Sequence, residues 1–373
     1  MMKKLSVSAC IFFIIMLLVS CAGTRGLSPT SDPSSAVYSG ARGDSPVYTY
    51  TVLDRELQNA AGQVSVPWRE NAAEMAVKTG TIRFYFMSGE KQNYSTNAGT
   101  KFGDSCLIAF PDGTIMLIDA GMPNYAPVLK ANLEALGVKK IDYAVLSHFH
   151  DDHYGAYWSG DDAILYNFEI GTFIWNGAYN TSDNAKANFQ RAIKANGIET
   201  RVLKAGDKMT IGDCTIELFN PNNSDEINGQ QLIEATLNNS SLLMKISYGE
   251  FDALFGGDIY VEQEMKLISM YPEGTFDVEM VKTNHHGTTA SSCKEWIAAT
   301  TPRVAVASSG NPLDSTVYGW FSKVGARVFG DAVDGYVRVV SDGYNCEVTT
   351  GRTRTTSIYD NFDRISEQVY PTK

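Results

Sequence analysis

The amino-acid sequence predicts an α/β domain with four layers, α/β/β/α, over about residues 81–350. From residue 81 onward, apolar strand-like segments interleave with amphipathic helical segments, which is typical of sheets covered by helices. The second half then repeats the strand and helix content of the first. Each half is therefore expected to supply one sheet and one helical layer.

The first half of this domain opens with apolar segments that end at turn residues. The predicted strands lie at 81–87, 105–110, 114–121 and 141–148, and an amphipathic helix that Gly137 ends lies at 125–137. Gly just after the last apolar position of a helical pattern is a helix stop signal. Apolar residues predominate at 114–121 and 141–148, which indicates buried strands.

The second half continues the alternation. Helices are predicted near 184–196, 261–270, 291–300 and 317–324, and strands at 214–219, 241–248, 252–258, 277–283, 303–309, 335–340 and 346–350. Residues 47–80 show a mixed pattern, which predicts only a weakly defined N-terminal cap with one strand and one helix. Residues 351–373 are expected to form a C-terminal tail.

The first 46 residues are predicted to target and tether the protein. Two lysines precede a short apolar run at 9–20, which is typical of a signal peptide. The sequence "LVSC" resembles the bacterial lipobox, which makes Cys21 the predicted lipid anchor and residues 1–20 a lipoprotein signal peptide; an ordinary secretory signal is the alternative. Residues 21–46 are rich in Gly, Ser and Pro and indicate a flexible tether. The tether contains an RGD-like tripeptide, Arg42 to Asp44, most simply a chance match.

The overall charge limits the range of partners. The chain carries a formal charge of -11 at a pI of about 5.0, whereas nucleic-acid binding depends on clustered Lys and Arg. No stable nucleic-acid complex is expected, although a local basic groove is compatible with this charge. The predicted localisation is the cell envelope, lipid-anchored and facing outside the cytoplasm, or secreted.

All five histidines lie in two short clusters. "HFHDDH" supplies His148, His150 and His153, together with Asp152, directly after a predicted strand. "NHHG" supplies the other two histidines, His285 and His286. Ligands commonly bind at the carboxyl ends of strands in α/β sheets. Imidazole and carboxylate groups at this density suit zinc at a site that also keeps a water. We expected the strand to end in a turn from which Asp152 and His153 converge on the two preceding histidines.

These motifs resemble those of a known superfamily. "HFHDDH" fits the HxHxDH signature of the metallo-β-lactamase superfamily, "LFGGD" its strand-end acidic motif and "NHHGTTAS" its last histidine motif. The segments 102–110, 115–121, 146–156, 238–258 and 281–291 follow in order the hydrolase domain of ComEC-type DNA-uptake channel proteins. This resemblance covers about residues 81–345 and implies the four-layer α/β/β/α metallo-β-lactamase sandwich.

The resemblance implies a set of site residues. His148 and His150 would bind a first metal, Asp152 and His153 a second, and Asp258 would bridge both. His286 is the better candidate for the remaining ligand of the second metal, while His285 would orient it or move a proton. Asp152 and His285 are the catalytic candidates. The expected cofactor is Zn²⁺, as one or two ions, with Mn²⁺ also possible.

One position departs from the superfamily pattern. No histidine occurs between His153 and His285, so the usual third histidine of the first metal is absent. Asn220, in "ELFNPNN", stands at the position where we expected that ligand. One-metal and two-metal sites are both compatible with the sequence.

The predicted chemistry is hydrolysis. A metal lowers the pKa of bound water from 15.7 to about 7, which would create hydroxide at neutral pH without a protein nucleophile. The ligand pattern is HxHxDH and not the more carboxylate-rich HxExD. This difference favours hydrolysis over di-iron redox chemistry. The expected substrate is a small molecule or phosphodiester; lactams, lactones and thioesters are alternatives, as is a non-catalytic surface binding protein.

Two further groups of residues have two interpretations each. Tyr154, Tyr157 and Trp158 could wall the substrate pocket or belong to the core. Four cysteines lie in the predicted domain, at positions 106, 214, 293 and 346. They could pair in an exported protein, but small buried apolar residues are the simpler interpretation.

Overall fold

A computed structural model gives the fold of the chain. It describes residues 46–53, 57–58, 64–65, 80–87, 103–308 and 313–352. These residues all lie in one compact unit, residues 37–373. The predicted signal peptide, Cys21, nearly all of the predicted tether with its RGD-like tripeptide, and the predicted tail beyond residue 352 lie outside the described residues.

The first sheet contains nine strands among the described residues, in the spatial order β1-β18-β17-β4-β5-β6-β7-β8-β9. They are β1 (Tyr48–Val52), β4 (Ile82–Phe86), β5 (Cys106–Ala109), β6 (Ile115–Ile118), β7 (Lys140–Leu146), β8 (Glu169–Trp175), β9 (Glu199–Val202), β17 (Val337–Ser341) and β18 (Cys346–Thr350). Strands β6 to β9 are parallel. Every residue of β4, β5 and β6 is buried, because both faces of the sheet are covered.

The second sheet contains seven strands in the described part of the chain, arranged in sequence order from β10 to β16. They are β10 (Lys208–Ile211), β11 (Cys214–Asn220), β12 (Leu243–Tyr248), β13 (Phe251–Phe255), β14 (Met280–Lys282), β15 (Val304–Ala307) and β16 (Arg327–Gly330). Strands β13 to β16 are parallel. A separate short pair is formed by β2 (Leu57–Gln58) and β3 (Val64–Ser65).

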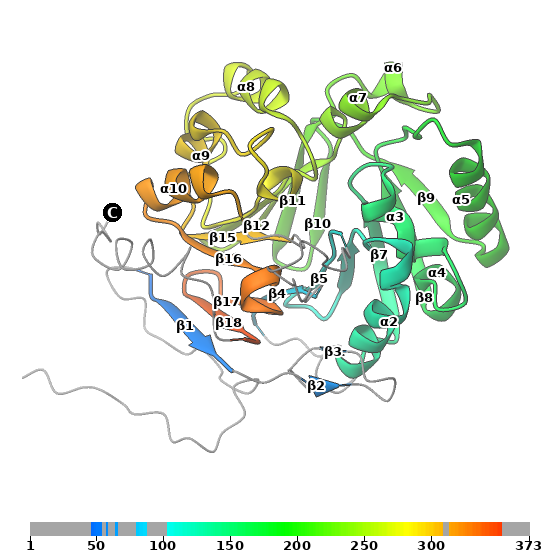
Figure 1. Cartoon of the computed structure of the whole chain (residues 1–373), viewed down its shortest axis with the longest axis horizontal. Helices are drawn as coiled ribbons and strands as arrows, with labels where there is room; N and C mark the ends of the chain where they lie inside the picture. The colour runs from blue at the N-terminus through cyan, green and yellow to red at the C-terminus, as the bar shows by residue number, and fades with distance from the viewer. Residues whose placement is uncertain are drawn as a thin grey trace, which may run out of the picture. The chain divides into compact units, whose positions relative to one another are not determined.

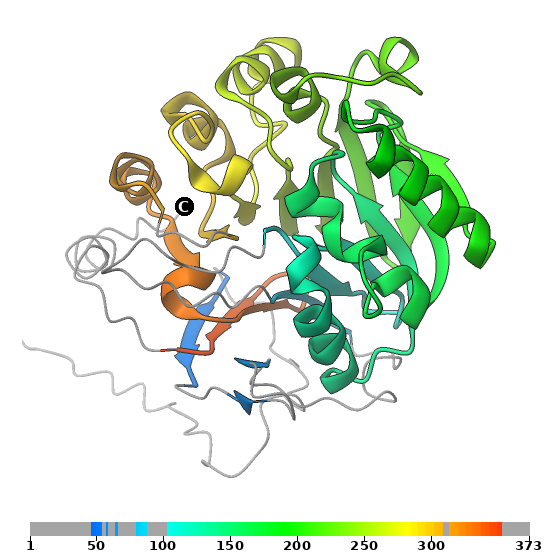
Figure 2. The same cartoon turned by 45° about the vertical axis from the view of Figure 1, so that its right-hand side comes forward.

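Helices cover the outer faces of both sheets (Figures 1 and 2). The first sheet carries α2 (Ala126–Ala135), α3 (Asp151–Trp158), α4 (Ile164–Asn167) and α5 (Asp183–Asn196), and the second carries α8 (Val261–Met270), α9 (Lys294–Thr300) and α10 (Ser315–Lys323). Shorter helices are η2 (Pro123–Tyr125), α6 (Ser224–Ile227), α7 (Glu234–Asn239), η3 (Asn284–Gly287) and α11 (Asp331–Asp334). The predicted four-layer α/β/β/α architecture is confirmed.

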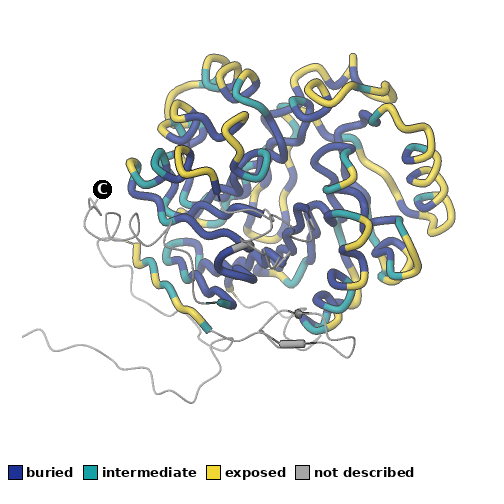
Figure 3. The backbone as a smooth tube through the Cα atoms, in the orientation of Figure 1, coloured by how far each residue is buried: buried dark blue, intermediate teal, exposed yellow. Residues whose placement is uncertain are grey.

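Three buried apolar clusters hold the layers together. One lies between the first sheet and its helices, one between the two sheets, and one between the second sheet and its helices. Between the sheets, the rings of Phe84 and Phe86 lie 6.0 and 6.2 Å from the ring of Phe255. Figure 3 shows the result: the central strands are buried, and exposed residues lie along the edge strand β1 and along outer helices such as α5.

The N-terminal part of the fold differs from the prediction. Strand β1 pairs in parallel with β18 over all five of its residues, so residues 48–52 belong to the main sheet rather than to a separate cap. The helix expected between residues 47 and 80 is not found in the described residues of that range, most of which lies outside the description. The sheet therefore begins before residue 81.

The described residues also bear on the cysteines and on membrane spans. Cys106, Cys214, Cys293 and Cys346 are all buried and unpaired, which agrees with their interpretation as small apolar residues. Within the described ranges, no helix combines the length and the apolar character that a bilayer crossing requires.

Candidate metal centre

Five chain segments end at one edge of the two sheets and place polar side chains there. Strand β6 leads to Asp119, β7 to His148, β13 to Asp258 and β14 to His286. Asp104 lies just before β5, which is antiparallel to β6, so it reaches the same edge. The carboxyl ends of parallel strands thus bring together residues far apart in the sequence.

The HDDH part of the first motif forms the start of helix α3, not the turn that we expected. His150 is the N-cap residue with extended backbone, φ -99° and ψ 154°, and Asp151 and Asp152 occupy the first turn. Acidic residues there interact favourably with the positive end of the helix dipole. The helix fixes Asp152 and His153 side by side, with His153 wholly buried.

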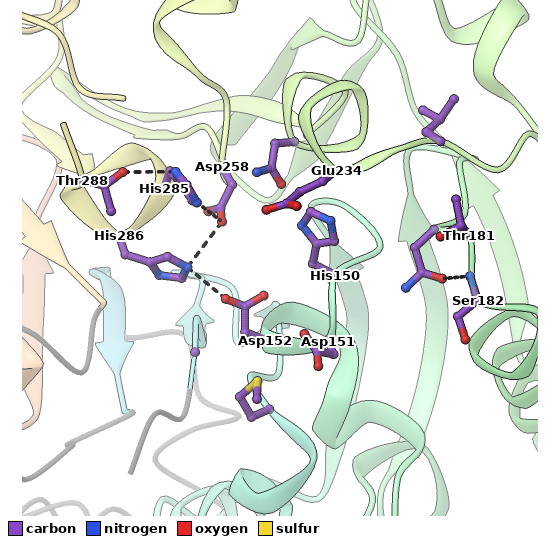
Figure 4. Close-up of a pocket in the computed structure, with 15 residues that line it drawn as sticks. His150, Asp151, Asp152, Thr181, Ser182, Glu234, Asp258, His285, His286 and Thr288 are labelled. Carbon is purple, nitrogen blue, oxygen red and sulfur yellow. Dashed lines mark hydrogen bonds and ion pairs between the residues drawn. The ribbon is translucent and has the colours of Figure 1, made fainter. Parts of the chain in front are cut away.

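The structure brings four predicted ligands into one group. Asp152, His153, Asp258 and His286 each offer a ligand atom, and these atoms all lie within 4.8 Å of one another. Asp258 Oδ2 lies 3.1 Å from His153 Nε2 and 3.3 Å from His286 Nε2. His286 Nε2 also lies 3.1 Å from Asp152 Oδ2 (Figure 4). This group is the set that the resemblance assigns to the second metal.

His148 and His150 form a second pair beside this group. His148 Nε2 lies 2.9 Å from His150 Nδ1, and the ring centroids of His148 and His153 are 4.2 Å apart. His148 is fully buried, and its Nδ1 lies 3.1 Å from Ser147 Oγ. Two imidazole nitrogens facing each other at this distance can share a cation.

Sequence reasoning missed the carboxylates that hold the ligand histidines. Asp119 Oδ2 lies 2.8 Å from His153 Nδ1, and Asp119 also accepts hydrogen bonds from the amide and hydroxyl of Ser147. Asp104 Oδ1 lies 3.2 Å from His286 Nδ1. A carboxylate on the far nitrogen of a ligand histidine fixes its tautomer and ring orientation. Both aspartates lie in the segments 102–110 and 115–121 that carry the resemblance, and a charge inside or beside a predicted apolar strand could have indicated them.

A buried lysine, also missed, neutralises part of this acidic cluster. Lys282 is 5% exposed, forms an ion pair with Asp104 and lies 3.5 Å from Asp258 Oδ1. Its Nζ also donates a hydrogen bond to the carbonyl of Gly257 at 3.0 Å. Burial alone would lower the pKa of Lys282, but Asp104 and Asp258 reverse this effect and raise it.

The electrostatics divide the histidines into two classes. Burial would lower the pKa of His153, but Asp258, Asp152 and Asp119 raise it well above its ordinary value. The same holds for His286 beside Asp258 and Asp104. Burial lowers the pKa of His148, His150 and His285. The acidic part of the site therefore attracts positive charge, whether a proton or a metal ion.

His285 lies on the cavity side of this centre. Its Nδ1 lies 3.1 Å from the Thr288 hydroxyl, and its Nε2 lies 3.9 Å from Asp258 Oδ2 (Figure 4). His285 and His286 both have left-handed backbone, with φ of 46° and 57°. Such strain in non-glycine residues often occurs at functional sites, and here it aims two adjacent imidazoles at the same centre.

A cavity of about 570 Å³ opens onto the centre. At one end it is lined by His150, Asp152, Asp258, His285 and His286, and at the other by Asn180, Thr181 and Ser182. Tyr154, Tyr157 and Trp158 do not line it; they are buried in the core between the first sheet and its helices. The core interpretation of these aromatics is therefore the right one.

Asn220 is not available as a metal ligand. Its Nδ2 donates to the carbonyls of Asn239 and Ser241 at 2.9 and 2.7 Å, and its Oδ1 accepts from Gln263 at 2.7 Å. These bonds satisfy the amide within the protein. The expected position of the third ligand of the first metal was therefore wrong. A different asparagine that sequence reasoning missed, Asn238, lines the cavity.

Comparison with known proteins agrees with this fold. The metallo-β-lactamase superfamily model matches residues 98–158. ComE operon protein 3 of Bacillus subtilis (strain 168) is 24% identical over 225 residues, covering 56% of this chain and 27% of that protein. Competence protein ComA of Neisseria gonorrhoeae is 23% identical over 207 residues, covering 54% and 24%. The chain thus spans about a quarter of the length of these relatives.

Solved structures with a similar fold were also found. The metallo-β-lactamase fold protein YhfI of Bacillus subtilis has a TM-score of 0.42 at 13% identity, covering 66% of this chain and 96% of YhfI. CmlA, a diiron β-hydroxylase from Streptomyces venezuelae, has a TM-score of 0.36 at 13% identity, covering 65% of this chain and 45% of CmlA.

The match to the superfamily model, the fold and the site support a metal-dependent hydrolase similar to those of the metallo-β-lactamase superfamily. Within that superfamily, the matched sequence is similar to the ComEC-type competence proteins, so the predicted resemblance is confirmed. This fold implies divalent metal ions, and the group of Asp152, His153, Asp258 and His286 is suited to hold one.

Proposed function

We propose that the protein is an extracytoplasmic hydrolase that cleaves a small phosphodiester with the help of one or two divalent metal ions, Zn²⁺ or Mn²⁺. The observation that carries this proposal is the convergence of Asp152, His153, Asp258 and His286 within 4.8 Å of one another, with all of them except the buried His153 lining the cavity. The ComEC-type similarity supports phosphodiesters over lactams, lactones and thioesters.

The residues present fit a metal ion. Two imidazoles and two carboxylates are ligands that zinc and manganese both accept, and the cluster has an excess of buried negative charge that a cation would balance. His148 and His150 would hold a first ion, the group of four would hold a second, and Asp258 would bridge them. When bound, such ions supply Lewis-acid polarisation of the phosphoryl group and activation of water.

The chain's own residues orient the reaction. Asp119 holds His153 through its Nδ1, and Asp104 with the Ser308 carbonyl, 2.8 Å away, holds His286 through its Nδ1. Thr288 holds His285 so that its Nε2 faces the cavity. His285 can therefore exchange a proton with a substrate or leaving-group oxygen at Nε2.

The size and charge of the cavity favour a small substrate. A volume of about 570 Å³ is in the range of pockets for small molecules. The described residues that line it include four carboxylates and no Lys or Arg, whereas long nucleic acids are bound through many basic contacts to phosphate. We therefore continue to expect no stable nucleic-acid complex.

The proposed activity is tested by turnover of two chromogenic substrates. Purified protein should hydrolyse bis(p-nitrophenyl) phosphate in the presence of zinc, manganese or magnesium, and should turn over nitrocefin weakly or not at all. Asp152→Asn should reduce phosphodiester hydrolysis by at least about tenfold, as loss of a metal-site interaction does. The matched control is Asp161→Asn, a nearby exposed carboxylate that does not line the cavity. Robust nitrocefin turnover without phosphodiesterase activity under any metal would refute the substrate class.

A further inference from the structure

Asn238 is a buried amide with an unsatisfied oxygen at the edge of the metal centre. It lies in the last turn of α7, is 1% exposed and lines the cavity together with His150 and Asp258. Its Oδ1 is buried without a hydrogen-bond partner. Buried polar groups are nearly always paired, so an unpaired amide at a cavity wall suggests a ligand that pairs with it.

The backbone around Asn238 fixes its place between the two strand ends that carry the histidines and the bridging aspartate. Its carbonyl accepts hydrogen bonds from the hydroxyl and the amide of Ser241, at 2.7 and 2.9 Å. The Ser241 hydroxyl oxygen accepts from the Asp258 amide at 3.1 Å, and the Leu242 amide donates to the Ser147 carbonyl at 2.9 Å. The segment is therefore tied to Asp258 on one side and to the residue before His148 on the other.

Neighbouring asparagines have structural roles that Asn238 lacks. Asn239 uses its Oδ1 to accept a hydrogen bond from the Tyr260 amide at 2.8 Å. Asn220 has both ends of its amide engaged with protein groups. No described protein group pairs with the Asn238 amide oxygen, which leaves this oxygen for a ligand at the cavity wall.

We infer that Asn238 supplies a neutral oxygen ligand to the first metal position, completing a set with His148, His150 and Asp258. This inference rests on the metal site of the proposed function. An amide oxygen is a weaker partner for zinc than an imidazole and is better suited to harder cations such as manganese. The first position therefore binds zinc more weakly than the second, and it accepts manganese more readily than a site with three histidines would.

Metal binding by variants of Asn238 tests this assignment without reference to activity. Apo-protein would be titrated with Zn²⁺ and Mn²⁺ by calorimetry, bound metal would be counted by elemental analysis, and the absorption of the Co²⁺-substituted protein would report the coordination. Asn238→Ala should keep one tightly bound zinc and weaken the other by at least about tenfold. Asn238→His should strengthen zinc at the first position by at least about tenfold over wild type and shift its preference from manganese to zinc.

Asn238→Asp and a control variant separate ligation from folding. The aspartate has the same shape but adds a charge, so it should tighten metal binding if it is a ligand, and should only destabilise the protein if the position is structural. The control is Asn180→Ala at the other end of the cavity, where the amide donates to the Tyr154 hydroxyl and accepts from the Ser182 amide; its metal binding should match wild type.

The outcomes distinguish this inference from the proposed function. If wild type binds two metals and all three Asn238 variants bind them with wild-type affinity, the assignment is wrong while the metal site stands. If wild type binds no metal, the proposed function fails and the assignment fails with it. Tighter binding in Asn238→Asp, with weaker binding in Asn238→Ala, supports the assignment even if no phosphodiester is turned over.

Discussion

At the scale of single residues, His285 is the group best placed to move a proton. Its side chain is 24% exposed and faces the cavity, while its neighbour His286 is in the group of four ligands. Burial lowers the pKa of His285, so the imidazole is neutral at pH 7 and can accept a proton. We therefore expect the two adjacent histidines to have different roles, because their side chains contact different partners.

Replacing His285 tests this role. His285→Gln should lower kcat by about 10²–10⁴-fold, which is the usual contribution of a general acid or base, with an unchanged metal content. The measurement is steady-state hydrolysis of bis(p-nitrophenyl) phosphate across pH 5–9 with metal analysis of each sample. Loss of bound metal together with activity would show instead that His285 is a ligand.

The positive charge of Lys282 compensates the buried carboxylates of Asp104 and Asp258. Lys282→Met should lower the free energy of unfolding by about 3–5 kcal/mol, because Asp104 and Asp258 would remain buried without their counter-charge. The double variant with Asp104→Asn should be more stable than Lys282→Met alone. Denaturant unfolding of the metal-free protein at pH 7 measures both. The control is Lys208→Met, an exposed ion pair with Glu217, which should cost less than about 1 kcal/mol.

The ion pair of Asp104 with Lys282 predicts that the free energy of unfolding depends on pH. Burial would raise the pKa of Asp104, but Lys282 and His286 outweigh it and hold the pKa below its ordinary value. A carboxylate with a lowered pKa stabilises the fold above the pKa of the unfolded chain, about 3.9, and loses that contribution as the pH falls further. Below about pH 4, the free energy of unfolding should therefore fall less steeply with decreasing pH in Asp104→Asn than in wild type. Denaturant unfolding at a series of pH values measures this, and equal slopes of the free energy of unfolding against pH in the two proteins would contradict it.

At the scale of elements, helix α8 holds the loop that carries the last two histidines. Glu264 of α8 is fully buried and accepts hydrogen bonds from the Asn284 side chain at 2.7 Å and from the amides of Ser292 and Cys293 at 2.6 and 2.9 Å. These contacts hold the first residue of η3 and the segment that follows η3. One carboxylate thereby connects the helical layer to the metal centre.

Removing that carboxylate should loosen the loop. Glu264→Ala should lower the free energy of unfolding by about 2–4 kcal/mol, because three buried donors lose a charged acceptor. Metal affinity at the second position should fall as well, since His286 would be less well fixed. Thermal unfolding with and without zinc measures both effects, and Glu262→Ala, at the start of the same helix and exposed, is the control. A destabilised Glu264→Ala protein with wild-type metal affinity would show that the hydrogen bonds of Glu264 contribute to stability alone.

The sequence predicted long regular elements well and short ones poorly. Helix α8 was expected at 261–270 and has those bounds, because its apolar positions follow the helical period. The sequence predicts a turn where helix α3 forms, because six of its eight residues are buried and an element that is buried on most sides shows no periodicity. Helix α7 has six residues and no comparable signal, so the sequence does not indicate that Asn238 lines the cavity.

Within the site, the sequence indicated the candidate ligands in the motifs. It did not indicate the charged residues that contact those ligands. The six expected metal ligands lie at one edge of the two sheets, and four of them form a group. Asp104 and Asp119 contact histidines 182 and 34 positions away in the chain, and Lys282 pairs with Asp104 across a similar separation. The packing of the two sheets brings Asp104 to His286 and Lys282, and the pairing of β6 with β7 brings Asp119 to His153. A single sequence carries no signal for such pairs.

At the scale of the whole molecule, the residues of the metal centre and the predicted targeting signal occupy different parts of the sequence. All elements of the metal centre lie between Asp104 and Ser308, whereas the lipobox-like sequence ends at Cys21. An acidic protein with a pI of about 5.0 is not attracted to anionic lipid by its net charge. Any stable membrane association should therefore come from the predicted anchor.

The membrane association of the native protein tests that anchor. Expressed in a bacterial host, wild type should sediment with the membrane fraction and partition into detergent, because a lipidated cysteine buries acyl chains at about 0.8 kcal/mol for each methylene group. Cys21→Ser should abolish lipidation and leave the protein in the aqueous phase or unprocessed, with hydrolysis by the purified protein unchanged. Cys106→Ser is the matched control, since Cys106 is a buried core residue and its removal should leave partitioning unaltered. Wild type that is fully aqueous, with an unmodified N-terminus, would leave only an ordinary secretory signal.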